Sequence, residues 1–232
     1  MIKKNYNRTN QWIKKYRFRL LLAATFMVLI LPAIAFKGIL SDILFVTSMS
    51  FLLIQSMIVA STGKKKRLWL RHTIVAIMII IFWLEPIGVR TPVFDSIRLL
   101  LLSTFFIFIT FHLIKFMRKS AKVNVNVIIT AINIYLLMGI IAASLSFIFY
   151  KILPGAYNFP SYITDPSFVN FAYYNFVTMS TVGYGDITPR LPQTQTLAYL
   201  VAVTGQLYVA IVIAFLVGKL LMHPVKQKDD QN

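Results

Sequence analysis

The most informative segment of the chain reads Thr181-Val182-Gly183-Tyr184-Gly185-Asp186. Its two glycines stand at alternate positions, and glycine accepts backbone conformations that a Cβ would make costly, so successive carbonyl oxygens can point the same way. The residues before it, 167–180, are largely apolar and aromatic. At about 1.5 Å per residue, a helix of this length is too short to cross a bilayer. Asp165 and Pro166 suit a helix start, so we expect a re-entrant helix over residues 166–180.

The composition of the 232 residues places this segment in a membrane protein. Hydrophobic residues make up 58% and charged residues only 13%, whereas a soluble surface needs roughly 25% charged residues. The net charge is +17, but the charges lie in short clusters between long apolar runs, so no nucleic-acid partner is needed to explain them. The chain has no cysteine, which excludes disulfides, thiolate metal sites and cysteine nucleophiles.

Charge-poor runs divide the chain into expected transmembrane helices, since a spanning helix needs about 17–25 apolar residues. Six such runs are interpreted as spans: residues 20–36, 43–63, 68–84, 99–114, 123–150 and 191–218. The last two are the longest and flank the re-entrant segment. The first four are expected to form a compact peripheral bundle.

The distribution of the 24 Lys and Arg residues predicts that both termini are cytoplasmic. Most of them fall before residue 20, at 64–71, at 115–122 and in the tail, and six spans place all four clusters on one side. One alternative stays open. The basic N-terminus, the first apolar run and Ala33-Ile34-Ala35 together mimic a signal peptide with its cleavage site, although we favour a retained first helix.

The Thr181–Asp186 segment, after a re-entrant helix and between two long spans, resembles the pore signature of potassium channels. The likeness covers roughly residues 123–222 and is to six-transmembrane potassium channels of the voltage-gated-like superfamily, of the prokaryotic type. It implies an all-α integral membrane protein that assembles as a four-fold symmetric homotetramer, because one chain supplies one strand of a closed ring. It also implies K⁺ ions in the filter, coordinated by rings of carbonyl oxygens as established for this motif, with no organic cofactor and no catalytic residue.

The resemblance assigns a role to each residue of this segment, which we call the candidate filter (residues 181–186). The carbonyls of Thr181, Val182, Gly183 and Tyr184 are expected to form stacked ion sites, and Gly185 to contribute to the outer mouth. Asp186, repeated four times, is expected to concentrate cations outside.

Neighbouring positions are expected to support the filter. Tyr173 and Tyr174 stand where the family usually has two bracing aromatic residues, often Trp. Val177 stands where some members carry a Glu that pairs with the filter Asp, so inactivation tied to that pair is in doubt. Thr178 to Ser180 form the helix end whose partial negative charge is expected to favour a cation in the central cavity.

Gly205 in the last span matches the family's hinge glycine. A second interpretation remains open, namely that Gly205 only allows close helix packing, as small residues do in membranes.

The resemblance divides the chain into four parts. These are a basic amphipathic cytoplasmic segment (1–19), the peripheral bundle (20–117), a pore domain (118–222) and a short cytoplasmic tail (223–232). Within the pore domain we expect an outer helix over 123–150, the pore helix over 166–180, the filter over 181–186 and an inner helix over 191–222.

The peripheral bundle resembles a voltage-sensor domain in layout but lacks its gating charges. A sensor needs several Arg at every third position of one helix. The fourth run has Arg98 near its outer end and then no charged residue until Lys115. Arg98 is expected to pair with Asp42 or Asp95, or to extend to the outer headgroups. Because the fourth run lacks this series of Arg residues, we expect the protein to have weak or absent voltage gating.

Two basic segments, residues 11–19 and 64–71, are candidates for contact with anionic lipid. A plain positive-inside flank explains the same charges equally well.

The leading hypothesis is a potassium-selective channel in the cell membrane that conducts passively. A potassium uptake transporter subunit, and a non-conducting sensor or assembly subunit with a channel-like fold, remain as alternatives.

Overall fold

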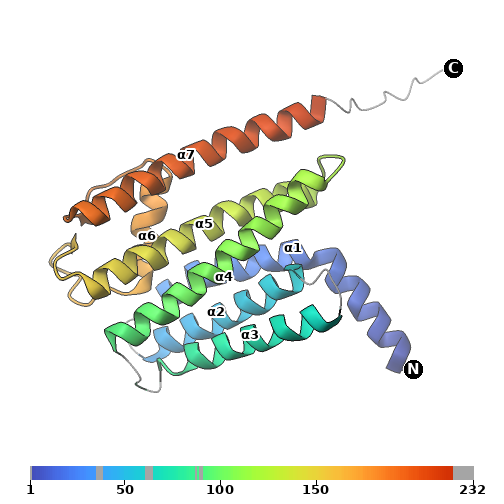
Figure 1. Ribbon diagram of the computed structural model, residues 1–232, viewed down its shortest axis with the longest axis horizontal. Helices are drawn as coiled ribbons and strands as arrows, with labels where there is room; N and C mark the ends of the chain where they lie inside the picture. Colours follow the sequence, from blue (N-terminus) through green and yellow to red (C-terminus); the bar gives the residue numbers. More distant parts are fainter. Residues whose placement is uncertain (1, 35–38, 61–64, 87, 89–90, 222–232) are drawn as a thin grey trace.

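The computed structural model describes residues 2–34, 39–60, 65–86, 88 and 91–221 of the chain (Figure 1). The described part is almost entirely helical. Its elements are α1 (Ile2–Ile34), α2 (Ile39–Ala60), α3 (Lys65–Trp83), α4 (Pro92–Lys119), α5 (Val125–Ile152), β1 (Tyr157–Asn158), α6 (Phe168–Met179), β2 (Thr188–Pro189) and α7 (Pro192–Leu221). The expected tail, 223–232, lies outside the described residues.

Four of the described helices, α2, α4, α5 and α7, are long and apolar enough to cross a membrane. The apolar part of α3, Arg71–Trp83, is shorter. An all-α multi-pass membrane protein is therefore confirmed, and the two further spans expected at 20–36 and 68–84 stay predictions.

Helices α1 to α4 form the peripheral bundle, and α4 packs lengthwise against α5 (Figure 1). The packing follows from helical periodicity. Leu99, Leu102, Phe106, Ile109 and Leu113 recur every three or four residues of α4, so all five lie on one face and are buried. The bundle and α5 thus share one continuous core.

The other half of the molecule consists of α5, the short α6 and α7. Helix α6 lies between α5 and α7, and α7 runs at the far edge from the bundle (Figure 1). The apolar window of α5 is 61% buried, whereas that of α7 is only 11% buried. Helix α7 therefore presents most of its apolar surface outward from the single chain.

Several expected boundaries shift by a few residues. The outer helix runs from 125 to 152 rather than 123 to 150, because Asn124 caps it: the side-chain oxygen of Asn124 accepts from the Val127 amide at 3.1 Å. The inner helix begins at Pro192 rather than at residue 191 and is described to Leu221, and residue 222 lies outside the described residues.

The start of the re-entrant helix was predicted wrongly. The helix begins at Phe168 and its N-cap is Ser167, not Asp165. The Ser167 amide donates to Asn170 Oδ1 at 2.9 Å, and the Ser167 hydroxyl donates to the same oxygen at 3.1 Å. This side-chain contact fixes the first turn two residues later than Pro166.

The boundary expected between residues 19 and 20 is also absent from the described backbone. Helix α1 continues from Ile2 through this point to Ile34, so the basic segment and the first apolar run form one helix. Residues 11–15 of the candidate lipid segment have side chains outside the described part.

Arg98 is buried, with 2% of its side chain exposed, so the expected extension to the headgroups is wrong. Its guanidinium pairs with Glu85, and its second Nη lies 3.4 Å from Asp95 Oδ1. The other oxygen of Asp95 lies 3.4 Å from Lys151 Nζ at the end of α5. The predicted ion pair between Arg98 and Asp95 is confirmed. Through Lys151, Asp95 also joins the bundle to α5.

Candidate functional site

The re-entrant helix α6 is anchored by a cluster of aromatic rings around Phe171. The ring centroid of Phe171 lies 5.1 Å from that of Phe147, 5.4 Å from Tyr150, 5.3 Å from Tyr157 and 5.6 Å from Phe159. Offset and edge contacts of this kind contribute about 0.5–1.5 kcal/mol per pair beyond burial. These rings come from α5, from β1 and from the residue that follows β1, so α6 is fixed to both α5 and the loop before it.

One polar side-chain pair sets the rotation of α6 against α5. The buried Asn175 amide donates to Ser146 Oγ of α5 at 2.9 Å, and it also donates to the Phe171 carbonyl of its own helix at 2.8 Å. Leaving a buried amide unpaired costs about 1–3 kcal/mol, so rotating α6 away from Ser146 is unfavourable. The sequence analysis did not identify this pair.

Gly139 in α5 is a further supporting residue that the sequence analysis missed. A Cβ at this position would overlap the ring of Phe176 in α6, where even the Cδ1 atom is 3.0 Å away. Glycine therefore allows the closest approach of the two helices. The signal in the sequence is a single glycine inside a long apolar helix.

The backbone of the candidate filter alternates in hand. The φ angles of Thr181, Gly183 and Gly185 are +62°, +56° and +76°. Among the described residues Thr181 is the only non-glycine with positive φ, so Val182 and Tyr184 in between lie on the negative side. A left-handed conformation costs a β-branched residue about 1–2 kcal/mol. Thr181 adopts this conformation, and its amide donates a hydrogen bond to the Thr178 carbonyl at 3.1 Å.

The amides of the candidate filter turn toward α6. Both the Val182 and the Gly183 amides donate to the Val177 carbonyl, at 3.1 and 3.3 Å. With the amides directed at the helix end, the peptide carbonyls of the same units point the opposite way, because a trans peptide places N–H and C=O on opposite sides. Val177 thus supports the segment through its backbone oxygen.

The hydroxyls at the end of α6 are engaged within the helix. Thr178 Oγ1 donates to the Tyr174 carbonyl at 2.8 Å, and Ser180 Oγ donates to the Phe176 carbonyl at 2.8 Å. Both side chains therefore satisfy carbonyls of the last helical turns.

The outer end of the filter is held by Tyr173. Its hydroxyl donates to Asp186 Oδ2 at 2.7 Å, and its ring stacks on Tyr184 with a centroid distance of 6.4 Å and an interplanar angle of 11°. The second oxygen of Asp186 accepts from the Ile187 amide at 3.0 Å. Both carboxylate oxygens of Asp186 are thus fixed by named donors.

Tyr174 is buried and packs edge-on against Tyr157, with ring centroids 5.6 Å apart, whereas Tyr173 is the tyrosine that lies on Tyr184. Burial raises the pKa of the Tyr157 hydroxyl, so this group stays protonated and neutral at physiological pH. Of the two residues expected to brace Tyr184, Tyr173 contacts it, whereas Tyr174 packs against Tyr157.

A short antiparallel sheet ties the loop before α6 to the segment after the filter. Tyr157 pairs with Pro189 and Asn158 pairs with Thr188. The Ala156 carbonyl accepts from the Arg190 amide at 2.9 Å and from the buried Thr194 hydroxyl at 3.0 Å. These contacts close a rigid outer frame around α6, which the sequence did not predict.

Gly205 lies where α7 touches the end of α6. A Cβ on Gly205 would be 2.6 Å from the Met179 carbonyl oxygen, a backbone atom that cannot rotate away. The neighbouring Gln206 amide reaches the same oxygen at 3.5 Å. Close packing of Gly205 is therefore observed, and its role as a hinge stays a prediction.

One chain leaves the candidate filter open. The side chain of Tyr184 is 70% exposed, and all residues from Thr181 to Gly185 are exposed. The filter segment and the outward apolar face of α7 thus meet no covering element within the described part of a single chain.

Residues 125–221 match a protein family described as an ion channel, and the matched range runs from the start of α5 to the end of α7. No curated protein and no solved structure matched the sequence. The part of the chain that is similar to ion channels thus consists of α5, α6 and α7, and the match supports an ion channel of the voltage-gated-like superfamily.

Proposed function

We propose that this protein is a potassium-selective channel that conducts K⁺ passively across the cell membrane. The observation that carries the proposal is the alternating backbone of Thr181 to Gly185, with the Val182 and Gly183 amides turned to Val177. This arrangement turns the carbonyl oxygens of Thr181 and Val182 to the opposite side, which supports a row of such oxygens along the segment. Such oxygens replace the hydration shell of K⁺ when four strands face one another.

The exposed surfaces of the single chain support a homotetramer. A carbonyl row on one chain supplies one quarter of each ion site, so closed sites require four copies around an axis. The apolar face of α7, whose spanning window is 11% buried, is available to pack against neighbouring copies. In this assembly α7 is the inner helix and Asp186 surrounds the outer mouth with four carboxylates.

The ligands proposed for the filter are K⁺ ions held by the carbonyls of Thr181, Val182, Gly183 and Tyr184, with Gly185 at the outer mouth. An organic cofactor, a catalytic group and a nucleic-acid partner form no part of the proposal. The helix end near Thr178 to Ser180 adds a partial negative charge toward the central cavity.

We further propose six spans with both termini in the cytoplasm of the cell. The concentration of Lys and Arg at the N-terminus, at 64–71 and at 115–122 supports this orientation. Arg98 is fixed in ion pairs with Glu85 and Asp95, and α4 carries no further charged residue until Lys115. We therefore expect weak or absent voltage gating, visible as a shallow conductance–voltage curve.

Planar bilayers containing the purified full-length chain test this function, with a high K⁺ concentration on one side and a low K⁺ concentration, balanced by Na⁺, on the other. The proposal predicts unitary current steps that reverse close to the K⁺ equilibrium potential and are blocked by barium. Saturable uptake without unitary steps would instead indicate a transporter. Absence of any K⁺ flux from a folded assembly would indicate a non-conducting subunit.

A further inference from the structure

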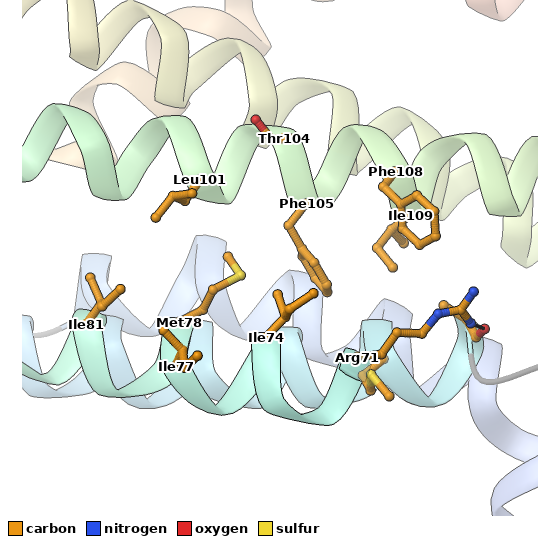
Figure 2. A pocket seen from close by; sticks show the side chains of 12 residues that line it. Arg71, Ile74, Ile77, Met78, Ile81, Leu101, Thr104, Phe105, Phe108 and Ile109 are labelled. Carbon is orange, nitrogen blue, oxygen red and sulfur yellow. Dashed lines mark hydrogen bonds between the residues drawn. The ribbon is translucent and has the colours of Figure 1, made fainter. Parts of the chain in front are cut away.

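A groove of about 680 Å³ lies between α3 and α4 on the outside of the peripheral bundle (Figure 2). Figure 2 shows Ile74 and Ile81 of α3 pointing toward Leu101 and Phe105 of α4, and Ile77 of α3 also lines the groove. The two polar residues of its lining are Arg71 and Thr104. The Thr104 hydroxyl is engaged by the Leu100 carbonyl of its own helix at 2.8 Å. The wall of the groove is therefore apolar along its length.

Arg71 closes one end of the groove (Figure 2). Its Nη1 donates to the Ala60 carbonyl, at the end of α2, over 2.6 Å, and its guanidinium carbon lies 5.7 Å from the Phe108 ring centroid. A guanidinium has five N–H donors, so the contact with Ala60 leaves donors for a second acceptor. The residues directly before α3 and in its first turn, 64–67, are all basic. Among the described side chains of the groove lining, Arg71 is the charged one, and it makes this end of the groove positive.

The length of the groove matches one leaflet of a bilayer. From Arg71 to Ile81, α3 rises about 15 Å, which is half of a hydrocarbon core of about 30 Å. An apolar channel of one-leaflet depth with a cation at its headgroup end is complementary to a single molecule that has an acyl chain and an anionic head.

We propose that the groove between α3 and α4 binds one acyl chain of an anionic phospholipid, with the lipid phosphate on Arg71. Arginine forms bidentate, charge-assisted hydrogen bonds with phosphate, so the head is fixed as well as attracted. The acyl chain of the lipid lies in the groove and packs against its apolar wall, which includes Ile77 and Phe105. On the orientation proposed above, the lipid belongs to the cytoplasmic leaflet. A second copy of the protein is a poorer occupant, because an apolar helix face would leave Arg71 without an anionic partner.

Native mass spectrometry of the purified full-length protein tests the site. Dioleoyl phosphatidylglycerol and dioleoyl phosphatidylcholine are the probes, since they share both chains and differ in headgroup charge. We expect phosphatidylglycerol to be retained preferentially, and Arg71→Gln to weaken its binding by about tenfold or more. Arg118→Gln is the matched control, because Arg118 is exposed at the same basic end of the bundle and is not part of the groove lining. Equal loss in both variants would overturn the proposal.

Two further arms separate the acyl chain from the headgroup. Ile77→Trp fills the groove without changing charge and is expected to reduce phosphatidylglycerol retention, which keeps the test valid should Arg71→Gln fail to fold. Free glycerol 3-phosphate, which has no chain, is expected not to compete. Retention that is unchanged in Ile77→Trp, or full competition by glycerol 3-phosphate, would show that the apolar groove holds no chain and would contradict the proposal.

The cysteine-free sequence allows a direct test for a protein occupant. Ile77→Cys places one thiol in the groove. We expect this variant to form no disulfide-linked dimer on mild oxidation in bilayers, since a lipid separates the groove from other copies. Efficient dimer formation would show that the groove faces a second copy and would overturn the lipid proposal.

Discussion

The Tyr173 hydroxyl donates a hydrogen bond of 2.7 Å to Asp186 Oδ2 and so connects the pore helix to the residue that ends the candidate filter. The same ring stacks on Tyr184, so one side chain contacts two of the six filter positions. At the neighbouring position where some relatives carry a pairing Glu, this chain has Val177, which supports the filter with its carbonyl instead. Tyr173 thus fixes the Asp186 end of the candidate filter through both its hydroxyl and its ring.

Removing the hydroxyl of Tyr173 should loosen this end. Tyr173→Phe keeps the ring but leaves Asp186 Oδ2 without its donor, and we expect steady-state K⁺ flux in liposomes to fall several-fold. The acceptor of this hydrogen bond is charged, which strengthens it, but the exposure of Tyr173 to solvent weakens it, so we expect a reduced flux and not a complete loss. Tyr162→Phe is the control, because Tyr162 is an exposed tyrosine of the outer loop. Equal flux in the two variants would show that the hydrogen bond has no role.

Gly139 is expected to tolerate no side chain. Gly139→Ala would press a methyl group into the Phe176 ring and should lower the free energy of unfolding by about 1–3 kcal/mol. Thermal unfolding of the purified protein measures this loss. The double variant Gly139→Ala/Phe176→Leu frees space, so its loss should be smaller than the sum of the two single losses. Additive losses would disprove the contact.

Gly205→Ala tests packing and hinge motion together. The new Cβ would lie 2.6 Å from the Met179 carbonyl oxygen, so we expect a loss of about 1–3 kcal/mol in stability. We also expect a lower open probability in single-channel records. Gly218→Ala in the same helix is the control, because a Cβ there meets no atom within 4 Å. Normal stability would argue against the packing role, and normal opening would refute the hinge.

Arg98 should matter for folding because it lies among buried carboxylates. Arg98→Met removes the buried cation that lies between Glu85 and Asp95, while Lys151 still pairs with Asp95, and breaking a buried ion pair costs about 3–5 kcal/mol. Thermal unfolding of the assembly provides the measurement. Triple replacement with Glu85→Gln and Asp95→Asn removes the charges as well and should recover part of the loss. A single Arg98→Met variant as stable as the native protein would contradict the buried network.

Much of the fold follows directly from the sequence. Helices α2, α4, α5 and α7 are long apolar runs, and their length alone identifies them as membrane spans. The ends of the helices are predicted less accurately, because a charged residue next to an apolar run does not always mark the end of a helix. Lys151 lies within α5, where it pairs with Asp95, and the cap of this helix is the uncharged Asn124.

The contacts that fix the site depend on partners far apart in the chain. Burial of Arg98 requires an acid, but the sequence does not show that Glu85, beyond the end of α3, provides one of the two. Gly139 signals a close approach without naming Phe176. The frame around Ala156 depends on a pairing of two-residue strands, which is too short to leave a pattern of alternation. Local signals thus predicted elements, and tertiary packing selected the partners.

The central claim is that four copies of the Thr181–Gly185 segment enclose a line of K⁺ sites. Cryo-electron microscopy of the purified protein in potassium solution tests it most directly. We predict a four-fold particle with a row of ion densities between the carbonyls of Thr181 to Tyr184. A monomer or dimer, or a tetramer in which these carbonyls point away from the axis, would contradict the account.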